Sequence, residues 1–493
     1  MVPFAAAWLA SAIILSFLGF VALSKNQKDV VYRRLGLRRQ ASSRPSTPSL
    51  EKQAPSKPLA SVAADLVLAF PPSPRGQLSK MVGAMPAAQR AAMGDLSFDE
   101  KKFPSSLLGF DENYATADDG KYNYTGFSVR ELKALGDFPD YATLSEVPMP
   151  QPYPEFDIDR ALPRPYRPFR WAYHQTMSLT KFEPDWWIEL ESTYRTRIAQ
   201  RKALYAEHGG AVLQWLPGSE LACKELMEMV LQFVCARYPQ YFSLSADKSV
   251  LENRILGTVT VIKAQPPLLV LLEHIPEDFG VVLRNPEDGH YYLRAGLICS
   301  ALGWNVASKI GLRLDAIHQP IPDYKEKMQF SMDRYFSKMP ANKPIQRGSW
   351  GLEVDQPLYM PPDDPHSAYR ATQDPSLPLS RIHLRVDWQT LRRLPLSGGV
   401  VFNFKALFTP VSEFRDEPYV PALVLQVLRE GKENLMKYKN TWHTQHVVMP
   451  ALEAYAKEQE EKGVVERGWE VKTLDDSPWF PGWREKWHRQ QGF

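Results

Sequence analysis

The sequence predicts an α+β fold, with an antiparallel sheet flanked by helices, preceded by a single transmembrane helix and a disordered linker. Three observations predict this arrangement. An uncharged run of 21 residues, Phe4 to Ser24, lies near the start of the 493-residue chain. A stretch rich in Pro and Ser follows it. Beyond that stretch, apolar residues recur with the periods of helices and strands. We expect an anchor at 1–24, a basic and Pro/Ser-rich segment at 25–126, and one domain at 127–493.

The apolar run Phe4 to Ser24 has the length of a membrane span. At about 1.5 Å per residue it reaches roughly 31 Å, close to the thickness of a bilayer core. The alternative is a cleaved signal peptide. A signal peptide has basic residues before its apolar run, and this run has none. Lys25, Lys28, Arg33 and Arg34 follow it. Because cytoplasmic flanks carry the excess of Lys and Arg, we expect a single-pass protein, in the endoplasmic reticulum membrane, with a cytosolic C-terminal domain.

The net charge of +3 is unevenly distributed. Residues 25 to 60 contain nine Lys and Arg against two acidic residues, so the rest of the chain is mildly acidic. Such a body gives no support for nucleic-acid binding. From Gln40 to about Pro104 the composition is that of a flexible tether.

Helices and strands are both expected in the body. Helical spacing occurs at 129–135, 185–206 and 220–238, and two helices are expected between 420 and 462. Residues 149–171 are rich in Pro and aromatic residues and should form an arm that lies extended across a surface. The runs PPLLVLLEH, DFGVVLRN and HYYLRAGLICSAL are predicted to form a meander. Ile382 to Trp388 and the segment VVFNFKALF alternate as strands, with His383, Arg385 and Asp387 on one polar face.

Motif searches exclude several classes of protein. The chain has no P-loop, no G-x-G-x-x-G, no H-E-x-x-H and no G-x-S-x-G. Its three cysteines, Cys223, Cys235 and Cys299, exclude a disulfide scaffold and a self-contained iron–sulfur cluster.

Weak candidate sites remain. Asp157-Ile-Asp159 has the form of a metal and sugar-nucleotide motif, which leaves a lumen-facing glycosyltransferase open; glycan at the sequon Asn123-Tyr124-Thr125 would support it. His443 and His446 are spaced for one helix face and read best as a surface or capping pair. The polar face of His383, Arg385 and Asp387 is ordinarily solvated, unless another layer covers it. His318 precedes two prolines, which suits an axial ligand as well as a buried core histidine.

Several motifs together resemble the haem-dependent oxidative N-demethylase family, whose fungal members are often called HRQ family proteins. The resemblance extends from about Val129 to about Ala456. It rests on four segments: ELKALGDFPDYATLSEVPMPQPYPEFD, YRPFRWAYHQTMSLTKFEPDWWIELESTYRTRIAQRKAL, GHYYLRAGLICSALGWNVASKIGLRLDAIHQPIPDY and LRVDWQTLRRLPLSGGVVFNFKALFTP.

The resemblance implies a PAS-like haem domain that oxidises a small methylated amine and releases formaldehyde. It implies electrons from NADPH through a separate flavin and iron–sulfur reductase. His318 becomes the candidate haem-iron ligand, and Lys309, Arg392 and Arg393 become candidates for pairing the haem propionates. Arg385 and Asp387 become candidate catalytic residues, with the carboxylate holding an ammonium and relaying a proton. Trp350 either closes the pocket or belongs to the core.

The sequence departs from the family pattern at three positions. Asp387 stands where a Glu is usual, Trp388 replaces the following Arg although Gln389 remains, and Lys405 stands where an Arg is common. Because a positioning error near 1 Å can cost about 100-fold in rate, the departures permit a second function, a haem-binding PAS-like sensor without turnover.

Overall fold

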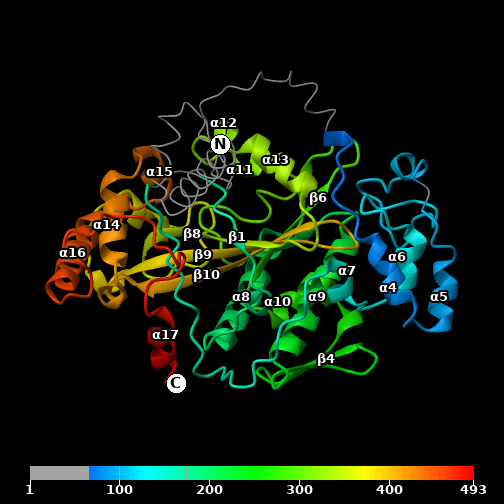
Figure 1. Ribbon diagram of the computed structural model, residues 1–493, viewed down its shortest axis with the longest axis horizontal. Coiled ribbons are helices and arrows are strands. Elements are labelled where there is room, and N and C mark those ends of the chain that lie inside the picture. Colours follow the sequence, from blue (N-terminus) through cyan, green and yellow to red (C-terminus); the bar gives the residue numbers. More distant parts are fainter. Residues whose placement is uncertain (1–65, 99, 173–175, 493) are drawn as a thin grey trace, which may run out of the picture. The chain divides into compact units, whose positions relative to one another are not determined.

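A seven-stranded antiparallel sheet forms the centre of the computed structural model, which describes residues 66–98, 100–172 and 176–492. Its strand order is β1-β8-β9-β10-β6-β7-β2 (Figure 1). Helices flank the sheet, so the predicted α+β class is confirmed. The strands are β1 (Thr180–Lys181), β2 (Leu213–Trp215), β6 (Asp278–Arg284), β7 (Tyr291–Leu297), β8 (Ile345–Val354), β9 (Ile382–Arg393) and β10 (Val400–Pro410).

Helices pack along the whole length of one face of this sheet, which we call the covered face. At one end, Val401 of β10 joins a core that contains Leu226 and Leu271. At the other end, Val386 of β9 joins a core that contains Val424. Figure 1 shows the first group of helices below the sheet and the second at its left end. These helices are α8 (Tyr194–His208), α9 (Glu220–Arg237), α10 (Pro267–His274), α14 (Val420–Glu430) and α16 (Trp442–Glu461).

Of the helices in the described residues, only those at one end pack against the opposite face, which we call the open face. Leu391 and Val400 pack there against Met332 and Phe336. Several side chains farther along this face are only half-buried. The three helices are α11 (Leu314–His318), α12 (Tyr324–Lys327) and α13 (Gln329–Lys338), above the sheet in Figure 1. The open face is therefore the place to look for a binding site.

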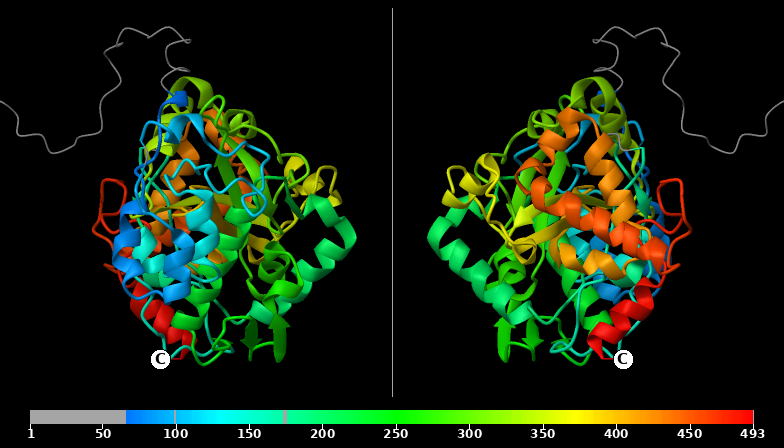
Figure 2. Two further views of the ribbon diagram at one scale, coloured as in Figure 1. Left: turned by 90° about the vertical axis from the view of Figure 1, so that its right-hand side faces the viewer. Right: turned by 90° about the vertical axis from the view of Figure 1, so that its left-hand side faces the viewer.

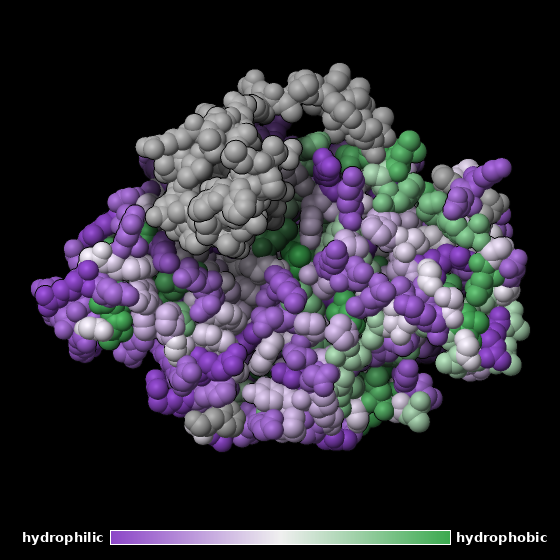
Figure 3. All heavy atoms as spheres, in the orientation of Figure 1, coloured by the Kyte–Doolittle hydropathy of each residue, from purple (hydrophilic) through white to green (hydrophobic). Residues whose placement is uncertain are grey.

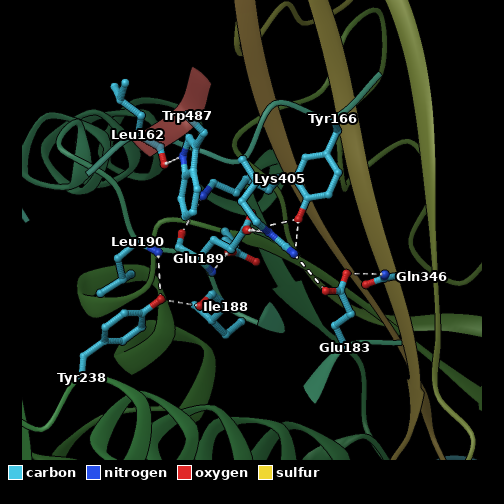
Figure 4. Close-up of polar contacts among 12 residues, drawn as sticks. Leu162, Tyr166, Glu183, Ile188, Glu189, Leu190, Tyr238, Gln346, Lys405 and Trp487 are labelled. Atoms are coloured by element: carbon cyan, nitrogen blue, oxygen red, sulfur yellow. Dashed lines mark hydrogen bonds and ion pairs between the residues drawn. The ribbon is translucent and has the colours of Figure 1, made fainter. Parts of the chain in front are cut away.

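The proline-rich arm was expected to lie extended across a surface, but its second half is buried in the covered face. Arg164 Nε donates to Glu189 Oε1 at 2.6 Å, and Lys405 Nζ donates to the Glu189 carbonyl oxygen at 2.6 Å. Figure 4 shows this network, in which Tyr166 Oη donates to Glu189 Oε1 and Gln346 Nε2 donates to Glu183 Oε1. The arm is thus part of the core.

One predicted strand is a helix. PPLLVLLEH forms α10, whereas the rest of the predicted meander forms β6 and β7. A continuous apolar run has no period that separates a buried helix from a buried strand. Pro267 occupies a first-turn position, where its missing N–H costs nothing, and five residues of the helix are buried.

The structured body begins earlier in the chain than the composition indicates. Leu78, Met81 and Met93 belong to the same core as α9, although they lie within the predicted linker. A few large apolar anchors are enough to dock a segment that is otherwise poor in aromatic residues. Ser128 and Glu131 form a capping box that starts the predicted helix at 129–135. The helices of this region are α4 (Leu78–Val82), α5 (Ala87–Met93), α6 (Val129–Leu135) and α7 (Tyr141–Ser145).

A second sheet and two short helices complete the described elements. Figure 2 shows the strands of the small sheet at the lower edge of both views. Its order is β3-β4-β5, and these strands are β3 (Phe242–Leu244), β4 (Val250–Asn253) and β5 (Thr258–Val261). The two helices are α15 (Glu433–Tyr438) and α17 (Trp483–Gln491).

The prediction of a single-pass membrane protein requires a correction. Among residues 66–98, 100–172 and 176–492, no helix combines the length and the apolar composition needed to cross a bilayer. The segment predicted to span, Phe4 to Ser24, and the basic cluster after it lie outside the described residues.

Candidate active site

Alternation along β8, β9 and β10 brings one set of polar and aromatic side chains to the open face. The register places Asp387 opposite Ser349 on one side and Ala406 on the other. Figure 3 shows apolar atoms in a hollow near the middle of the view, close to where β1 is labelled in Figure 1. The half-buried residues on the open face are Arg347, Ser349, Asp387, Gln389, Phe402, Phe404 and Phe408.

His318 is the last residue of α11, on the same side of the sheet. Its Nδ1 lies 2.6 Å from the carbonyl oxygen of Leu314, one turn earlier, and its ring stacks on Tyr324 with centroids 5.3 Å apart. The carbonyl can only accept, so Nδ1 carries the proton and Nε2 keeps its lone pair. Nε2 makes no hydrogen bond within the described part of the chain. Burial lowers the pKa of His318, which favours this neutral form.

Two cations lie beside His318. Lys309 Nζ donates to the carbonyl oxygen of Ile317 at 3.2 Å. Arg347 of β8 is close enough to lower the pKa of His318 further. Burial also lowers the pKa of Lys309. An anionic group placed next to His318 would thus meet two positive charges.

Arg385 fixes the carboxylate of Asp387. Nε and Nη2 of Arg385 donate to Asp387 Oδ1 at 3.0 and 2.9 Å. The same guanidinium donates to the carbonyl oxygens of Ser300 and Pro357 at 2.7 and 2.8 Å. Arg385 is buried, whereas the Asp387 side chain is 30% exposed. Asp387 Oδ2 accepts no hydrogen bond from the residues that the structure describes, so it can receive one from a ligand.

Lys439 and Ser349 lie in the same part of the open face, and neither was predicted from the sequence. Lys439 Nζ donates to Ser349 Oγ at 2.9 Å and lies over the Trp350 ring. Burial, with the nearby charge of Arg347, lowers the pKa of Lys439 to about 8, and Asp387 opposes that shift. Trp350 itself is 4% exposed and packs on Phe169 in the core. Lys439 lies between α15 and α16, far in sequence from the strand that it contacts. No local pattern in the sequence therefore marks it as a site residue.

The other two candidate propionate partners lie away from this group. Arg393 is on the open face, but its guanidinium is bound by three carbonyl oxygens, those of Met339, Phe336 and Gly398. Arg392 points to the covered face and lies between Trp187 and Phe182. Adjacent residues of a strand face opposite ways, so the pair cannot serve one ligand.

The remaining residues that the sequence suggested as sites are bound to other protein groups or buried in the fold. Asp157 Oδ1 accepts the backbone N–H of Asp159, and Asp159 pairs with Arg195. His443 is buried, not a surface residue. Within the described residues, no group of three or more His, Cys, Asp and Glu side chains has the geometry to hold a metal ion.

The glycosylation sequon is also part of the fold. Asn123 is 6% exposed, and its Nδ2 donates to the carbonyl oxygen of Leu396 at 2.7 Å. Its amide is therefore not available as a reporter of topology in the folded chain.

The family match agrees with this geometry. Residues 178–449 match the family model described as haem-dependent oxidative N-demethylase, alpha subunit-like. This chain belongs to that family. The match includes α11 and all of β8, β9 and β10, which together carry His318, Arg385 and Asp387. The family name supports a haem-linked oxidoreductase.

Proposed function

We propose that the open face binds haem and that the chain catalyses oxidative N-demethylation of a small amine. The observation that carries the proposal is the state of His318. Its Nδ1 is committed to a backbone carbonyl, which orients the ring and leaves Nε2 as a donor for iron. This arrangement is the usual one for an axial imidazole.

The surrounding residues fit a haem group in three further respects. Half-buried Phe402 and Phe404 offer apolar surface next to Ile310 and Ile317. Lys309 and Arg347 supply positive charge for two propionates. Asp387 and Lys439 lie close to Arg347, so the polar group of a substrate would be held near the same surface. His318, Lys309 and Arg347 are thus the residues that we assign to haem binding.

Bound haem supplies the iron chemistry that activates dioxygen. In the overall reaction one C–N bond of the amine breaks, and the methyl carbon leaves as formaldehyde. Dioxygen provides the formaldehyde oxygen, and its other oxygen leaves as water. Two electrons from NADPH, with protons, balance the change. We propose that a separate flavin and iron–sulfur reductase delivers them, since three cysteines are too few for a cluster in this chain.

The protein's own contribution is to bind and orient the amine. Asp387 Oδ2 is placed to accept a hydrogen bond from a substrate ammonium, and it can accept a proton there as the amine reacts. Arg385 acts through Asp387, because its two hydrogen bonds fix the carboxylate in one rotamer. Asp387 is one methylene shorter than Glu, which favours a bulkier amine that reaches farther toward the strand.

Haem binding is tested by the absorption spectrum of the full chain after reconstitution. The wild type should show a Soret band. His318→Ala should lose at least 10-fold in haem affinity. His208→Ala, which removes a partly exposed histidine of α8, should leave the spectrum unchanged. An unaltered spectrum in His318→Ala would remove His318 from the site.

Turnover is tested separately. With NADPH and a surrogate flavin and iron–sulfur reductase, the haem-loaded chain should release formaldehyde from dimethylamine or a larger N-methylamine. A chain that binds haem and releases none from any N-methylamine would instead be the haem-binding sensor.

A further inference from the structure

Arg392 is a buried cation on the covered face, opposite the proposed haem site. It lies on β9 and is 7% exposed. Its guanidinium carbon is 4.1 Å from the centroid of the Trp187 ring and 5.6 Å from that of Phe182. Burial lowers the pKa of Arg392 to about 9, still above neutral pH, so the group is charged.

The guanidinium of Arg392 makes no hydrogen bond and no ion pair with any residue that the structure describes. Its Nε is buried without an acceptor. The other buried arginines nearby differ in this respect. Arg164 is bound by Glu189 and Glu183, and Arg393 by three carbonyl oxygens. An unpaired buried charge costs several kcal/mol, so a protein interior rarely leaves one without a counterion.

A second buried donor without an acceptor lies next to Arg392. Trp187 is 2% exposed, and its indole Nε1 has no acceptor among the described residues. Both residues line one cavity of about 20 Å³. The volume exceeds the roughly 10–15 Å³ that one water molecule requires. The cavity is also lined by Tyr141, Ala142, Val147, Pro148, Met149, Pro150, Pro184, Met229, Gln232 and Phe233.

Two further polar side chains of this lining donate their hydrogen bonds to other residues. Gln232 Nε2 donates to the carbonyl oxygens of Phe138 and Pro139, and Tyr141 Oη donates to Glu228 Oε2 at 2.6 Å. No carboxylate lines the cavity. The site therefore offers donors and positive charge without a carboxylate to neutralise that charge.

We propose that this cavity binds a small monovalent anion of chloride size, held by Arg392 and by the indole N–H of Trp187. A halide accepts hydrogen bonds and neutralises the guanidinium, which is what the site requires. Polyatomic anions such as sulfate are too large for about 20 Å³. A water molecule would satisfy the two donors but would leave the charge uncompensated.

The anion would join three segments that are distant in sequence. Arg392 is on β9, Trp187 follows the arm, and Met229 and Phe233 come from α9. Anything that binds only the folded state stabilises it, and the stabilisation grows with the logarithm of ligand concentration above its Kd. The folded chain should thus depend on halide for part of its stability.

Thermal unfolding of the full chain tests this at constant ionic strength, with sodium chloride replaced stepwise by sodium gluconate. The melting temperature should rise with the logarithm of chloride concentration. Bromide should act like chloride, and sulfate should give no such specific rise. A melting temperature that is the same in chloride and gluconate would overturn the proposal.

Variants separate a specific site from a general salt effect. Arg392→Met should abolish the difference between chloride and gluconate, and in gluconate it should be no less stable than the wild type, because it removes an uncompensated charge. Trp187→Phe should reduce the difference. Arg415→Met, at an exposed ion pair, should retain it in full. Retention of the full difference in Arg392→Met would refute the site.

A crystal of the full chain grown in bromide gives the direct readout. An anomalous peak between Arg392 and Trp187 would establish the ligand. Density without an anomalous signal would show water only, and the proposal would fail. Neither result depends on haem, so this test and that of the proposed function can fail independently.

Discussion

The two faces of the central sheet use polar side chains in opposite ways. On the covered face, charged groups are saturated by partners from other segments: Arg167 binds both carboxylate oxygens of Glu417 at 2.6 and 2.7 Å, and Arg164 pairs with Glu189. On the open face, His318 and Asp387 each retain an atom without a partner in the described chain. The difference indicates that the first set holds the fold together, whereas the second is available to a ligand. Arg392 is the exception on the covered face.

The largest effect that this comparison predicts is on catalysis. Asp387→Asn should lower the rate of formaldehyde release by about 100- to 10,000-fold, because it removes the proton acceptor. The melting temperature should fall only moderately, because the amide oxygen of the new side chain can still accept the two hydrogen bonds of Arg385, which also keeps its two carbonyl partners although its counterion is lost. Asp355→Asn, whose carboxylate pairs with an exposed Arg381, is the matched control and should keep its rate. Equal loss in both variants would deny Asp387 a role in the site.

On the covered face, the corresponding change should act on stability alone. Arg167→Met leaves Glu417 buried with only Lys486 as a charged partner, and should cost about 3–5 kcal/mol in the free energy of unfolding. Urea denaturation measures the loss. The double variant Arg167→Met/Glu417→Leu should recover part of it, because no unpaired carboxylate remains. A loss below about 1 kcal/mol in the single variant would contradict the contrast between the faces.

Below the covered face, His274 should make stability depend on pH. Asn253 and Thr260 contact its two ring nitrogens, and burial lowers its pKa to about 4. The unfolded chain, with a pKa near 6.5, binds the proton more readily, so stability is lost as pH falls from about 6.5 to about 4. The loss should be at most about 3 kcal/mol. In His274→Gln, stability measured across this range should fall less steeply; an identical slope would exclude His274 as the cause.

The smallest effect is expected at the exposed ion pairs. The Arg381 and Asp355 side chains are 37% and 45% exposed, and solvent screens the pair. Asp355→Asn should therefore change the free energy of unfolding by less than about 1 kcal/mol. The same urea measurement checks it, and a cost as large as that of Arg167→Met would show that burial does not set these energies.

Local pattern was enough to predict β9 and β10, two of the three strands that carry the site, but it did not predict β8. The alternation from Ile382 to Trp388 identified β9 and the shared face of Arg385 and Asp387, and the alternation of VVFNFKALF identified β10. What the pattern could not show was which layer covers each face. Arg385 is buried because the loops at Ser300 and Pro357 pack against it. These residues are 85 and 28 positions from Arg385 in the sequence, so no local pattern predicts the contacts.

The same limit explains the propionate candidates and the missed residues. Because successive side chains of a strand point to opposite faces, Arg392 and Arg393 could have been assigned to different faces from the sequence alone. The prediction did not apply this rule to them. Lys439 approaches Ser349 through a tertiary contact across 90 residues, which no local period encodes. The ambiguity of PPLLVLLEH is of another kind, because the environment of a short apolar run decides between helix and strand. The haem assignment to His318 stays a prediction until a spectrum tests it.

The pairing of β9 with β10 separates the three positions that depart from the family pattern onto two faces of the sheet. Trp388 and Lys405, two of the three departures from the family pattern, are direct cross-strand partners on the covered face. Trp388 stacks on Tyr166 of the arm with ring centroids 3.9 Å apart, and Lys405 Nζ donates to the backbone carbonyl oxygen of Glu189. Both side chains are therefore engaged in the interior of the covered face, where a ligand on the open face does not reach them. Asp387 is then the single one of the three positions that a substrate on the open face would meet.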